Sequence, residues 1–313
     1  MAKEMLYSEI VDVYERLAVT AKRLEKTTIL SAFLQRLKDI GKYEWIYLLK
    51  GKVVADYDSR EIGISQQLAI KAISSAFGVS SENIVERYRK IGDLGEIAEE
   101  FASKRKQNAL FQNKLEVGKV FENLRKIMGV EGKGAIDRKI ALITELLGNA
   151  SGKEVKYIVR TLLSDLRVGV ADGIIRDAIA EAFFGDGKKE IVDEIEKAYD
   201  LSGDFALVFE AAAKGKKHLG NVVLVPGKPV NVMLAVKVAT IEEAFEACGK
   251  PAVIEYKYDG FRMIISFDGK EIKLFTRRLE DVTKQFPDVV SVIKKYVKGE
   301  SFILDSEVVG YDP

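Results

Sequence analysis

The hydrophobic period changes once along the 313 residues, and this change limits the fold more than any other feature. From residue 1 to about 215, apolar residues recur at steps of three and four, as in Leu30, Phe33 and Leu34, which is typical of amphipathic helices. From Pro251 onward apolar and polar residues alternate, which is typical of strands. The sequence therefore predicts an α+β, multidomain chain, with an all-α part followed by a mainly antiparallel β part.

The domain limits follow from this change and from the residues that break regular structure. We expect a helical domain over 1–215, a linker over 216–230, and the N-terminal part of a β-containing domain over 231–313. Pro226 and Pro229 place the linker, since proline disfavours continuous helix or central strand.

Local signals place several element boundaries. Thr27 and Thr28 are predicted to cap a new helix, and Ser65 to cap a later one. Residues 263–275 are predicted to form a hairpin around an Asp-Gly turn. Residues 286–297 are predicted to form a helix that opens near a proline.

Composition excludes several classes of protein. Hydrophobic residues make up 47% and charged residues 31%, which suits a globular protein, and no apolar run approaches the ~20 residues of a membrane span. We expect a cytoplasmic protein, because the N-terminus also lacks the apolar core of a signal peptide. The single cysteine, Cys248, excludes an internal disulfide and is expected to be a buried thiol. A net charge of +1 neither indicates nor excludes a nucleic-acid partner, which requires a basic face only.

One lysine lies between two carboxylates in an alternating stretch. If residues 253–258 form a strand, Glu255, Lys257 and Asp259 share one face, and Gly260 permits a tight turn or a close approach to a ligand. A solvated charge ladder on an antiparallel sheet explains this pattern, and so does a nucleophilic amine. Local spacing leaves both readings open.

Residues further along the chain favour the nucleophile. The stretch Lys257-Tyr258-Asp259-Gly260, with Arg262 after it, resembles the lysine motif of the covalent nucleotidyltransferases, namely DNA ligases, RNA ligases and mRNA capping enzymes. Two further motifs of that family are matched in order by residues 276–280 and 302–309. The helical region upstream makes the chain most similar to the archaeal and eukaryotic ATP-dependent DNA ligases.

The resemblance implies roles for these residues. Lys257 would be the nucleophile that attacks the α-phosphate of ATP. Glu255 would lie against the adenine, Arg262 and Arg277 would serve the ribose and phosphates, and Glu307 would contact the sugar or a Mg²⁺ ion. Phosphoryl transfer needs cations around the developing charge, which agrees with this set of residue types.

Supporting roles are implied for neighbouring residues. Asp259 would orient Lys257 or the metal, and Gly260 would turn the chain. Asp305 is expected to be structural. Ser306 stands where glycine is frequent in the family, and this departure puts a close backbone approach there in doubt. The cofactors implied are ATP and Mg²⁺.

A second cluster of cations lies in the helical region. Arg160 and Arg167 are seven residues apart, which would place them on one helical face, and Gly169 and Gly173 flank a turn into a helix that carries Arg176. A helix start with nearby arginines favours phosphate, whereas a helix–turn–helix corner with surface arginines explains the same spacing. The resemblance favours a domain that grips nicked duplex DNA through its backbone.

Residues 103–112 are basic and then apolar. A solvated loop explains this composition, but Gln107, Leu110 and Phe111 also resemble the short motif by which archaeal ligases bind the sliding clamp, PCNA. The match lacks the usual final pair of aromatic residues.

Taken together, the resemblance implies an ATP-dependent DNA ligase that acts on nicked double-stranded DNA in replication, repair and recombination, as a monomer. Because Pro313 follows directly after the third motif, we expect the chain to be an N-terminal fragment that does not seal nicks alone. The alternatives are another lysine-nucleotidylating enzyme, such as an RNA ligase or capping enzyme, and a DNA-binding or clamp-binding module in which Lys257 has no chemical role.

Overall fold

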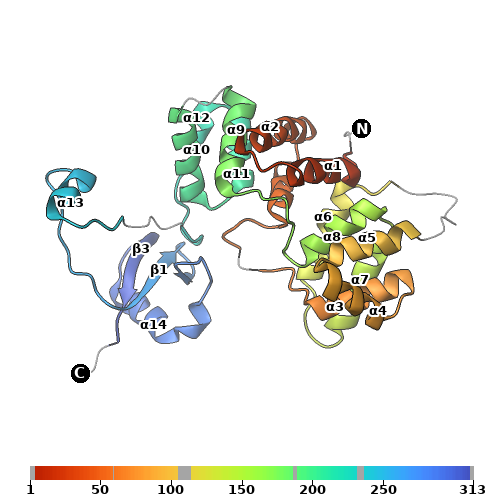
Figure 1. Cartoon of the computed structure of the whole chain (residues 1–313). Coiled ribbons are helices and arrows are strands. Elements are labelled where there is room, and N and C mark those ends of the chain that lie inside the picture. The colour runs from red at the N-terminus through yellow and green to blue at the C-terminus, as the bar shows by residue number, and fades with distance from the viewer. Residues whose placement is uncertain (1–3, 59, 105–113, 186–188, 231–235, 311–313) are drawn as a thin grey trace. The chain divides into compact units, whose positions relative to one another are not determined.

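The computed structural model describes residues 4–58, 60–104, 114–185, 189–230 and 236–310, which divide into two compact units (Figure 1). The first unit contains residues up to 55, 60–197 and 204–221. The second contains residues 56–59, 198–203 and everything from 222 onward.

The first part of the chain is helical, as the sequence predicts. Its elements are α1 (Tyr7–Ala18), α2 (Arg23–Ile40), the 3-10 helix η1 (Tyr43–Lys50), α3 (Gln66–Phe77), α4 (Ser81–Ile91), α5 (Leu94–Lys104), α6 (Val117–Met128), α7 (Ala135–Gly148), α8 (Gly152–Leu162), α9 (Asp172–Phe184), α10 (Lys189–Ser202), α11 (Phe205–Lys214) and α12 (Lys216–Leu219). The short helix α12 packs on α11, within the range expected to be linker.

Pairs of helices bury the apolar stripes seen in the sequence. The closest packing joins α5 to α8, α2 to α9, and α3 to α7. At the centre, the buried rings of Tyr14 and Tyr157 lie 4.9 Å apart and link α1 to α8. The hydroxyl of Tyr14 donates a hydrogen bond to the carbonyl oxygen of Leu48 at 2.7 Å. Since buried hydroxyls need a partner, this bond fixes η1 against α1.

The predicted start of the second helix is wrong, whereas that of α3 is confirmed. Helix α2 begins at Arg23, four residues before Thr27. Thr27 is buried inside the helix, and its hydroxyl donates back to the carbonyl oxygen of Arg23 at 3.0 Å, which satisfies it without a cap. Ser65 does cap α3, where its hydroxyl oxygen accepts a hydrogen bond from the Leu68 amide at 3.2 Å.

The second unit contains a small antiparallel sheet. Its elements are α13 (Ile241–Cys248), β1 (Phe261–Phe267), β2 (Ile272–Thr276), the 3-10 turn η2 (Thr283–Gln285), α14 (Pro287–Tyr296) and β3 (Phe302–Val308). The strand order is β2-β1-β3, and both pairings are antiparallel. The predicted hairpin between β1 and β2 and the predicted helix α14 are both confirmed.

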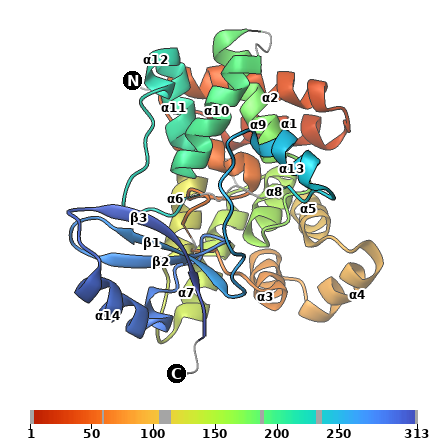
Figure 2. The ribbon, with the colours of Figure 1, turned by 90° about the vertical axis from the view of Figure 1, so that its left-hand side faces the viewer.

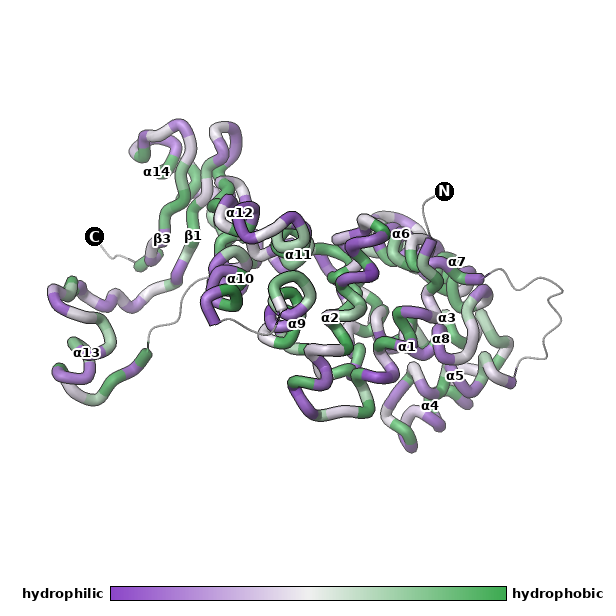
Figure 3. The backbone as a smooth tube through the Cα atoms, turned by 90° about the horizontal axis from the view of Figure 1, so that it is seen from above, coloured by the Kyte–Doolittle hydropathy of each residue, from purple (hydrophilic) through white to green (hydrophobic). Residues whose placement is uncertain are grey.

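One face of the sheet forms the core of this unit. Met263 and Ile265 on β1, Leu274 on β2 and Ile293 on α14 are buried together. Helix α14 covers this face (Figure 2), and β1 is mostly hydrophobic along its length (Figure 3). Because side chains alternate along a strand, the residues between these on β1 lie on the opposite face.

Two expectations for this unit are wrong. The described structure has no strand over 253–258; β1 begins only at Phe261, which pairs with Val308 at the end of β3. Strand β2 ends at Thr276, opposite Met263, and the chain then turns back. Strand β3 ends at Val308, opposite Phe261. Neither strand therefore pairs with residues that precede Phe261. Cys248 is exposed, not buried, because α13 contains no buried residue.

Within the described ranges, no helix combines the length and the apolar composition needed to cross a bilayer.

Candidate functional site

Arg262 lies on the central strand of the sheet, on the face opposite α14. The register of the sheet places it directly opposite Glu307 on β3. Its guanidinium donates two hydrogen bonds to Asp305, from Nε to Oδ1 at 2.9 Å and from Nη2 to Oδ2 at 2.5 Å. The hydrogen bonds with Asp305 raise the pKa of Arg262, so it remains charged. Two motifs that are distant in sequence therefore meet here in one cation–carboxylate group.

Lys257 lies just before this group in the chain and is exposed. Glu255 and Asp259 are exposed as well, as are the aromatic rings of Tyr256 and Tyr258, at 85% and 63%. Four residues separate Lys257 from Arg262, and no described residue forms an ion pair with the lysine. The structure thus leaves the amine open to a ligand, but it does not bring the amine into contact with the carboxylates.

Gly260 joins the lysine stretch to the sheet and packs too closely for any side chain. A Cβ atom at this position would lie 2.5 Å from the carbonyl oxygen of Val308 and 3.0 Å from Cγ of Glu307. A carbon atom cannot approach a backbone oxygen that closely. The requirement for glycine here is a close approach to β3, and that approach holds the start of β1 against Glu307.

Arg277 follows β2 in a tight turn. Thr276 is buried, and its hydroxyl accepts hydrogen bonds from the amides of Arg278 at 3.1 Å and Glu280 at 3.3 Å. Leu279 has a positive φ of 66° in the same turn. The arginine is exposed at the end of the strand that neighbours β1.

The hydroxyl of Ser306 donates a hydrogen bond to the carbonyl oxygen of Met263 at 2.8 Å. It braces β3 against β1, and nothing in the sheet requires glycine there.

The residues present fit a magnesium ion only with the help of a nucleotide. Among the described residues there is no group of three or more metal-ligating side chains. Asp305 is engaged by Arg262, which leaves the exposed Glu307 as the carboxylate ligand on this face. Mg²⁺ is commonly held by one or two carboxylates together with substrate phosphates, so Glu307 could serve in that way.

In the helical unit, Arg160 and Arg167 converge on Asp93. Asp93 is 4% exposed and accepts hydrogen bonds from Arg160 Nη2 at 2.7 Å and from Arg167 Nη1 at 3.1 Å. Burial alone would raise the pKa of Asp93, but the hydrogen bonds and charge of Arg160 outweigh it and hold this pKa below its usual value.

Two expectations about these arginines need correction. They do not share a helical face, because α8 ends at Leu162 and Arg167 follows with a positive φ of 57°. Moreover, the Arg160 side chain is only 8% exposed, and its charge is used by Asp93. This burial argues against a direct phosphate contact by Arg160, whereas Arg167 is 43% exposed.

Cations from α2 hold the loop that leads into α9. Lys26 is buried, and its Nζ donates to the carbonyl oxygens of Val168 at 2.7 Å and Gly169 at 2.9 Å. Gly169 has a φ of 62°, and a Cβ there would lie 2.6 Å from the lysine nitrogen. The predicted turn before α9 is therefore confirmed, with α2 as its anchor.

The start of α9 is surrounded by further cations. Near Gly173, the Nη2 atoms of Arg23 and Arg176 would lie 3.3 Å and 3.6 Å from an added Cβ. Arg23 also donates to Asp177 at 2.6 Å, and Arg176 pairs with Glu196. Sequence spacing around α9 could not show Arg23 or Lys26, which lie about 150 residues earlier. The one available signal was Lys26, a charged residue on the same helical stripe as Leu30.

The candidate clamp-binding residues Gln107, Leu110 and Phe111 lie outside the described residues.

The helical unit thus places Arg23 and Arg176 at the start of α9. In the sheet, Arg262 bonds to Asp305 and lies opposite Glu307, and the exposed Lys257 precedes this group in the chain. This arrangement agrees with the class of protein that the sequence motifs indicate, the covalent nucleotidyltransferases. Comparison with known families assigns it: residues 6–180 match the family model described as DNA ligase N terminus, and residues 232–313 match ATP dependent DNA ligase domain. The chain belongs to the DNA ligase family.

Individual relatives agree with this assignment. A DNA ligase of Nanoarchaeum equitans is 42% identical over 98% of this chain and 53% of that protein. A DNA ligase of Thermococcus onnurineus is 39% identical over 98% of this chain and 54% of that protein. DNA ligase 2 of Korarchaeum cryptofilum is 36% identical over 99% of this chain and 52% of that protein. The chain therefore spans about half the length of the curated relatives it matches.

Proposed function

We propose that this chain supplies the DNA-gripping part and the lysine-bearing part of an ATP-dependent DNA ligase that seals nicks in duplex DNA. The observation that carries the proposal is the group formed by Arg262, Asp305 and Glu307 on one sheet face, immediately after the exposed Lys257. The family assignment supports the same reaction, because the matched region includes all of these residues.

In the first step, Nζ of Lys257 loses a proton and attacks the α-phosphate of ATP. A P–N bond forms, the bond from the α-phosphate to the bridging oxygen breaks, and pyrophosphate departs. Arg262 and Arg277 would offset negative charge on the phosphates, and Glu307 would accept a hydrogen bond from the ribose or hold Mg²⁺. When bound, Mg²⁺ would neutralise phosphate charge. Glu255 would contact the adenine, and Asp259 would orient the lysine.

In the second step, an oxygen of the 5′-phosphate at a nick attacks the phosphorus of lysyl-AMP. The P–N bond breaks and Lys257 recovers its proton. In the third step, the adjacent 3′-hydroxyl attacks the 5′-phosphate, a phosphodiester bond forms, and AMP leaves.

The helical unit would hold the duplex through its phosphates. Gly173, Arg176 and Arg23 lie at the start of α9, where backbone amides favour anions, and Gly169 lies in the loop before it. Arg167, which is 43% exposed and bonded to Asp93 and Gly92, would add a phosphate contact from that loop. We assign Arg160 to holding Asp93 instead of touching DNA. Such contacts read shape and charge, so binding should weaken steeply with salt.

The remaining parts of the proposal follow from the family. The protein would act in replication, repair and recombination, in the cytoplasm and as a monomer. Residues Gln107, Leu110 and Phe111 would bind the sliding clamp. The part of the predicted linker, 216–230, that follows α12 would allow the two parts to close around DNA.

The decisive test is the formation of lysyl-AMP. The 313-residue chain and the longest product of its gene are incubated with α-labelled ATP and Mg²⁺ without DNA, then denatured. We expect acid-labile label on the wild-type protein and none on Lys257→Ala, while Lys284→Ala, which removes a lysine outside the site, keeps the label. Label that persists in Lys257→Ala would refute the assigned nucleophile, and absence of label from every wild-type form would refute the ATP-dependent reaction.

A second assay, with nicked duplex added, separates the alternative of a binding module. In that case Lys257→Ala would bind nicked duplex and retain every activity of the wild type. Nick sealing that disappears in Lys257→Ala, together with unchanged DNA binding, would exclude it.

A further inference from the structure

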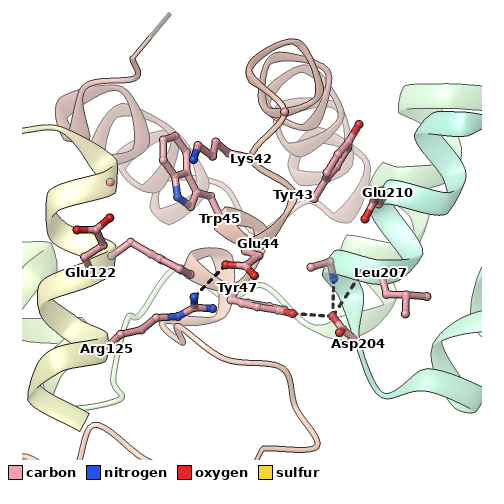
Figure 4. Close-up of a pocket in the computed structure, with 14 residues that line it drawn as sticks. Lys42, Tyr43, Glu44, Trp45, Tyr47, Glu122, Arg125, Asp204, Leu207 and Glu210 are labelled. Atoms are coloured by element: carbon pink, nitrogen blue, oxygen red, sulfur yellow. Dashed lines mark hydrogen bonds and ion pairs between the residues drawn. The ribbon is translucent and has the colours of Figure 1, made fainter. Parts of the chain in front are cut away.

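Two cavities in the helical unit share a wall and run along α6. The first, about 560 Å³, lies between η1, α6 and the start of α11 (Figure 4). The second, about 470 Å³, lies between residues 4–5, α6 and α7. Lys42, Trp45, Gly118 and Glu122 line both, so the two form one groove, which we call the α6 groove. Cavities of this size accommodate several side chains or a small ligand.

The α6 groove combines aromatic rings with an excess of carboxylates. Tyr43, Trp45, Tyr47 and Phe121 line its first cavity. Over both cavities, seven lining residues are acidic and four are basic. Rings and carboxylates together attract cations, because the ring face and the carboxylate both carry negative potential. The same excess repels nucleic-acid phosphate, so this groove is unsuited to DNA.

The protein already places one guanidinium in the groove. Arg125 lies over the ring of Phe121 with its guanidinium carbon 4.4 Å from the ring centre. Its Nη1 lies 3.0 Å from a carboxylate oxygen of Glu44, and its Nε donates to the carbonyl oxygen of Val53 at 2.8 Å. Figure 4 shows this arginine crossing the floor between α6 and η1. The chemistry of the groove is therefore demonstrated by a side chain of the chain itself.

Two polar groups remain available beside Arg125. Glu122, at the junction of the two cavities, is exposed and enters no ion pair with any described residue. Asn123 is 5% exposed and lines the second cavity, and its Nδ2 finds no hydrogen-bond partner within the described structure. An unpaired buried amide is costly, and an incoming carbonyl oxygen would satisfy it.

We propose that the α6 groove docks a peptide segment of a partner protein that carries arginine or lysine beside apolar side chains. A cation of the segment pairs with the exposed carboxylate of Glu122, near Trp45, whose ring is largely buried and already has Lys42 Nζ 6.0 Å from its centre. Apolar side chains of the segment enter the two cavities, and one of its carbonyl oxygens accepts from Asn123. This surface is separate from the start of α9 and does not depend on the ligase reaction.

Trp45 is the only tryptophan of the chain and lines both cavities, so its fluorescence reports occupancy directly. The 313-residue chain is titrated with an acetylated and amidated peptide of alternating arginine and leucine, and with the matched peptide of glutamate and leucine. The variants are Glu122→Gln, Glu122→Lys, and Glu82→Gln as a matched control on the exposed start of α4, outside the groove. Unchanged far-ultraviolet circular dichroism establishes that each variant is folded.

We expect a saturable change in Trp45 emission with the arginine peptide and none with the glutamate peptide. Affinity should fall about two- to fivefold in Glu122→Gln, which is typical for loss of one exposed ion pair, and at least about tenfold in Glu122→Lys. Glu82→Gln should bind like the wild type. The proposal is overturned if the arginine peptide leaves the emission unchanged, if both peptides bind alike, or if the Glu122 variants bind as tightly as Glu82→Gln. A Trp45 response to nicked duplex that depends on Glu122 would assign the groove to nucleic acid and would also overturn it.

Discussion

Replacing Asp93 by asparagine should destabilise the helical unit strongly. Asp93 is 4% exposed and accepts hydrogen bonds from Arg160, from Arg167 and from the amides of Gly95 and Glu96. Asparagine keeps the shape, but it has one oxygen for these donors and no charge. Arg160 would then keep only the half-exposed Glu96, whose Oε1 lies 3.4 Å from its Nη2, as a counter-ion. Breaking a buried pair costs about 3–5 kcal/mol, and we take the lower end because Glu96 remains.

The loss is measured by urea unfolding of the chain, followed at Trp45, which lies in the helical unit. We expect the free energy of unfolding at pH 7 to fall by about 3 kcal/mol, and the midpoint of thermal unfolding by roughly 6–12 °C. The control is Glu25→Gln on α2, which breaks the exposed pair between Lys22 and Glu25 and should leave the midpoint unchanged. A loss below about 1 kcal/mol for Asp93→Asn would refute the reasoning about this buried pair.

The pH dependence of this effect has a definite sign. The pKa of Asp93 is lower in the folded protein than its usual value, so the stabilisation is present above the unfolded pKa and is lost as the pH falls through the folded value. Asp93→Asn should remove that acid-dependent loss, and its stability should therefore vary less with pH below about 4.

Three further predictions test other parts of the molecule. Burial alone would raise the pKa of Glu15, but the Tyr157 hydroxyl and Lys156 lower it to about 2, so wild-type stability should fall as the pH drops from 4.5 toward 2. Because solvent screens this carboxylate, Glu15→Gln should lose only about 1 kcal/mol at pH 7, and it should lack that acid step in urea titrations. Gly169→Ala should cost about 1–2 kcal/mol by thermal unfolding, because φ is positive and the new Cβ meets the Lys26 nitrogen; an unchanged midpoint would contradict this. Gly260→Ala should reduce lysyl-AMP formation at least about tenfold without changing the unfolding followed at Trp45, because the sheet and not the helical unit must shift.

Much of the fold was available from the sequence because local patterns determined it. The helical period located the first unit, and the capping hydroxyl of Ser65 and the alternating hairpin located α3, β1 and β2. Thr27 was misread because threonine occurs both at helix starts, where it caps, and inside helices, where its hydroxyl bonds to the preceding turn. The residue type alone does not distinguish the two positions. The strand expected over 253–258 failed for a non-local reason: alternation marks residues that suit a strand, but a strand also needs a neighbour to pair with.

The candidate site was predictable only as far as its motifs reach. The motifs named Arg262 and Glu307, and the register of β1 and β3 brings them together. They did not show that Asp305 holds Arg262, or that Arg160 faces inward to Asp93. Both facts depend on pairs that are 43 and 67 residues apart, and such pairs leave no periodic trace in the sequence.

The anchoring of the loop before α9 by Lys26 has a consequence for how the protein is made. The lysine and the two carbonyl groups it binds are separated by 142 and 143 residues, and Arg23 reaches Asp177 across 154. During synthesis α2 leaves the ribosome long before α9 exists, and local contacts form before distant ones. The cationic surface around the start of α9 is therefore among the last features of the helical unit to assemble. A nascent chain would not acquire the surface proposed to bind phosphate until nearly all of that unit had been translated.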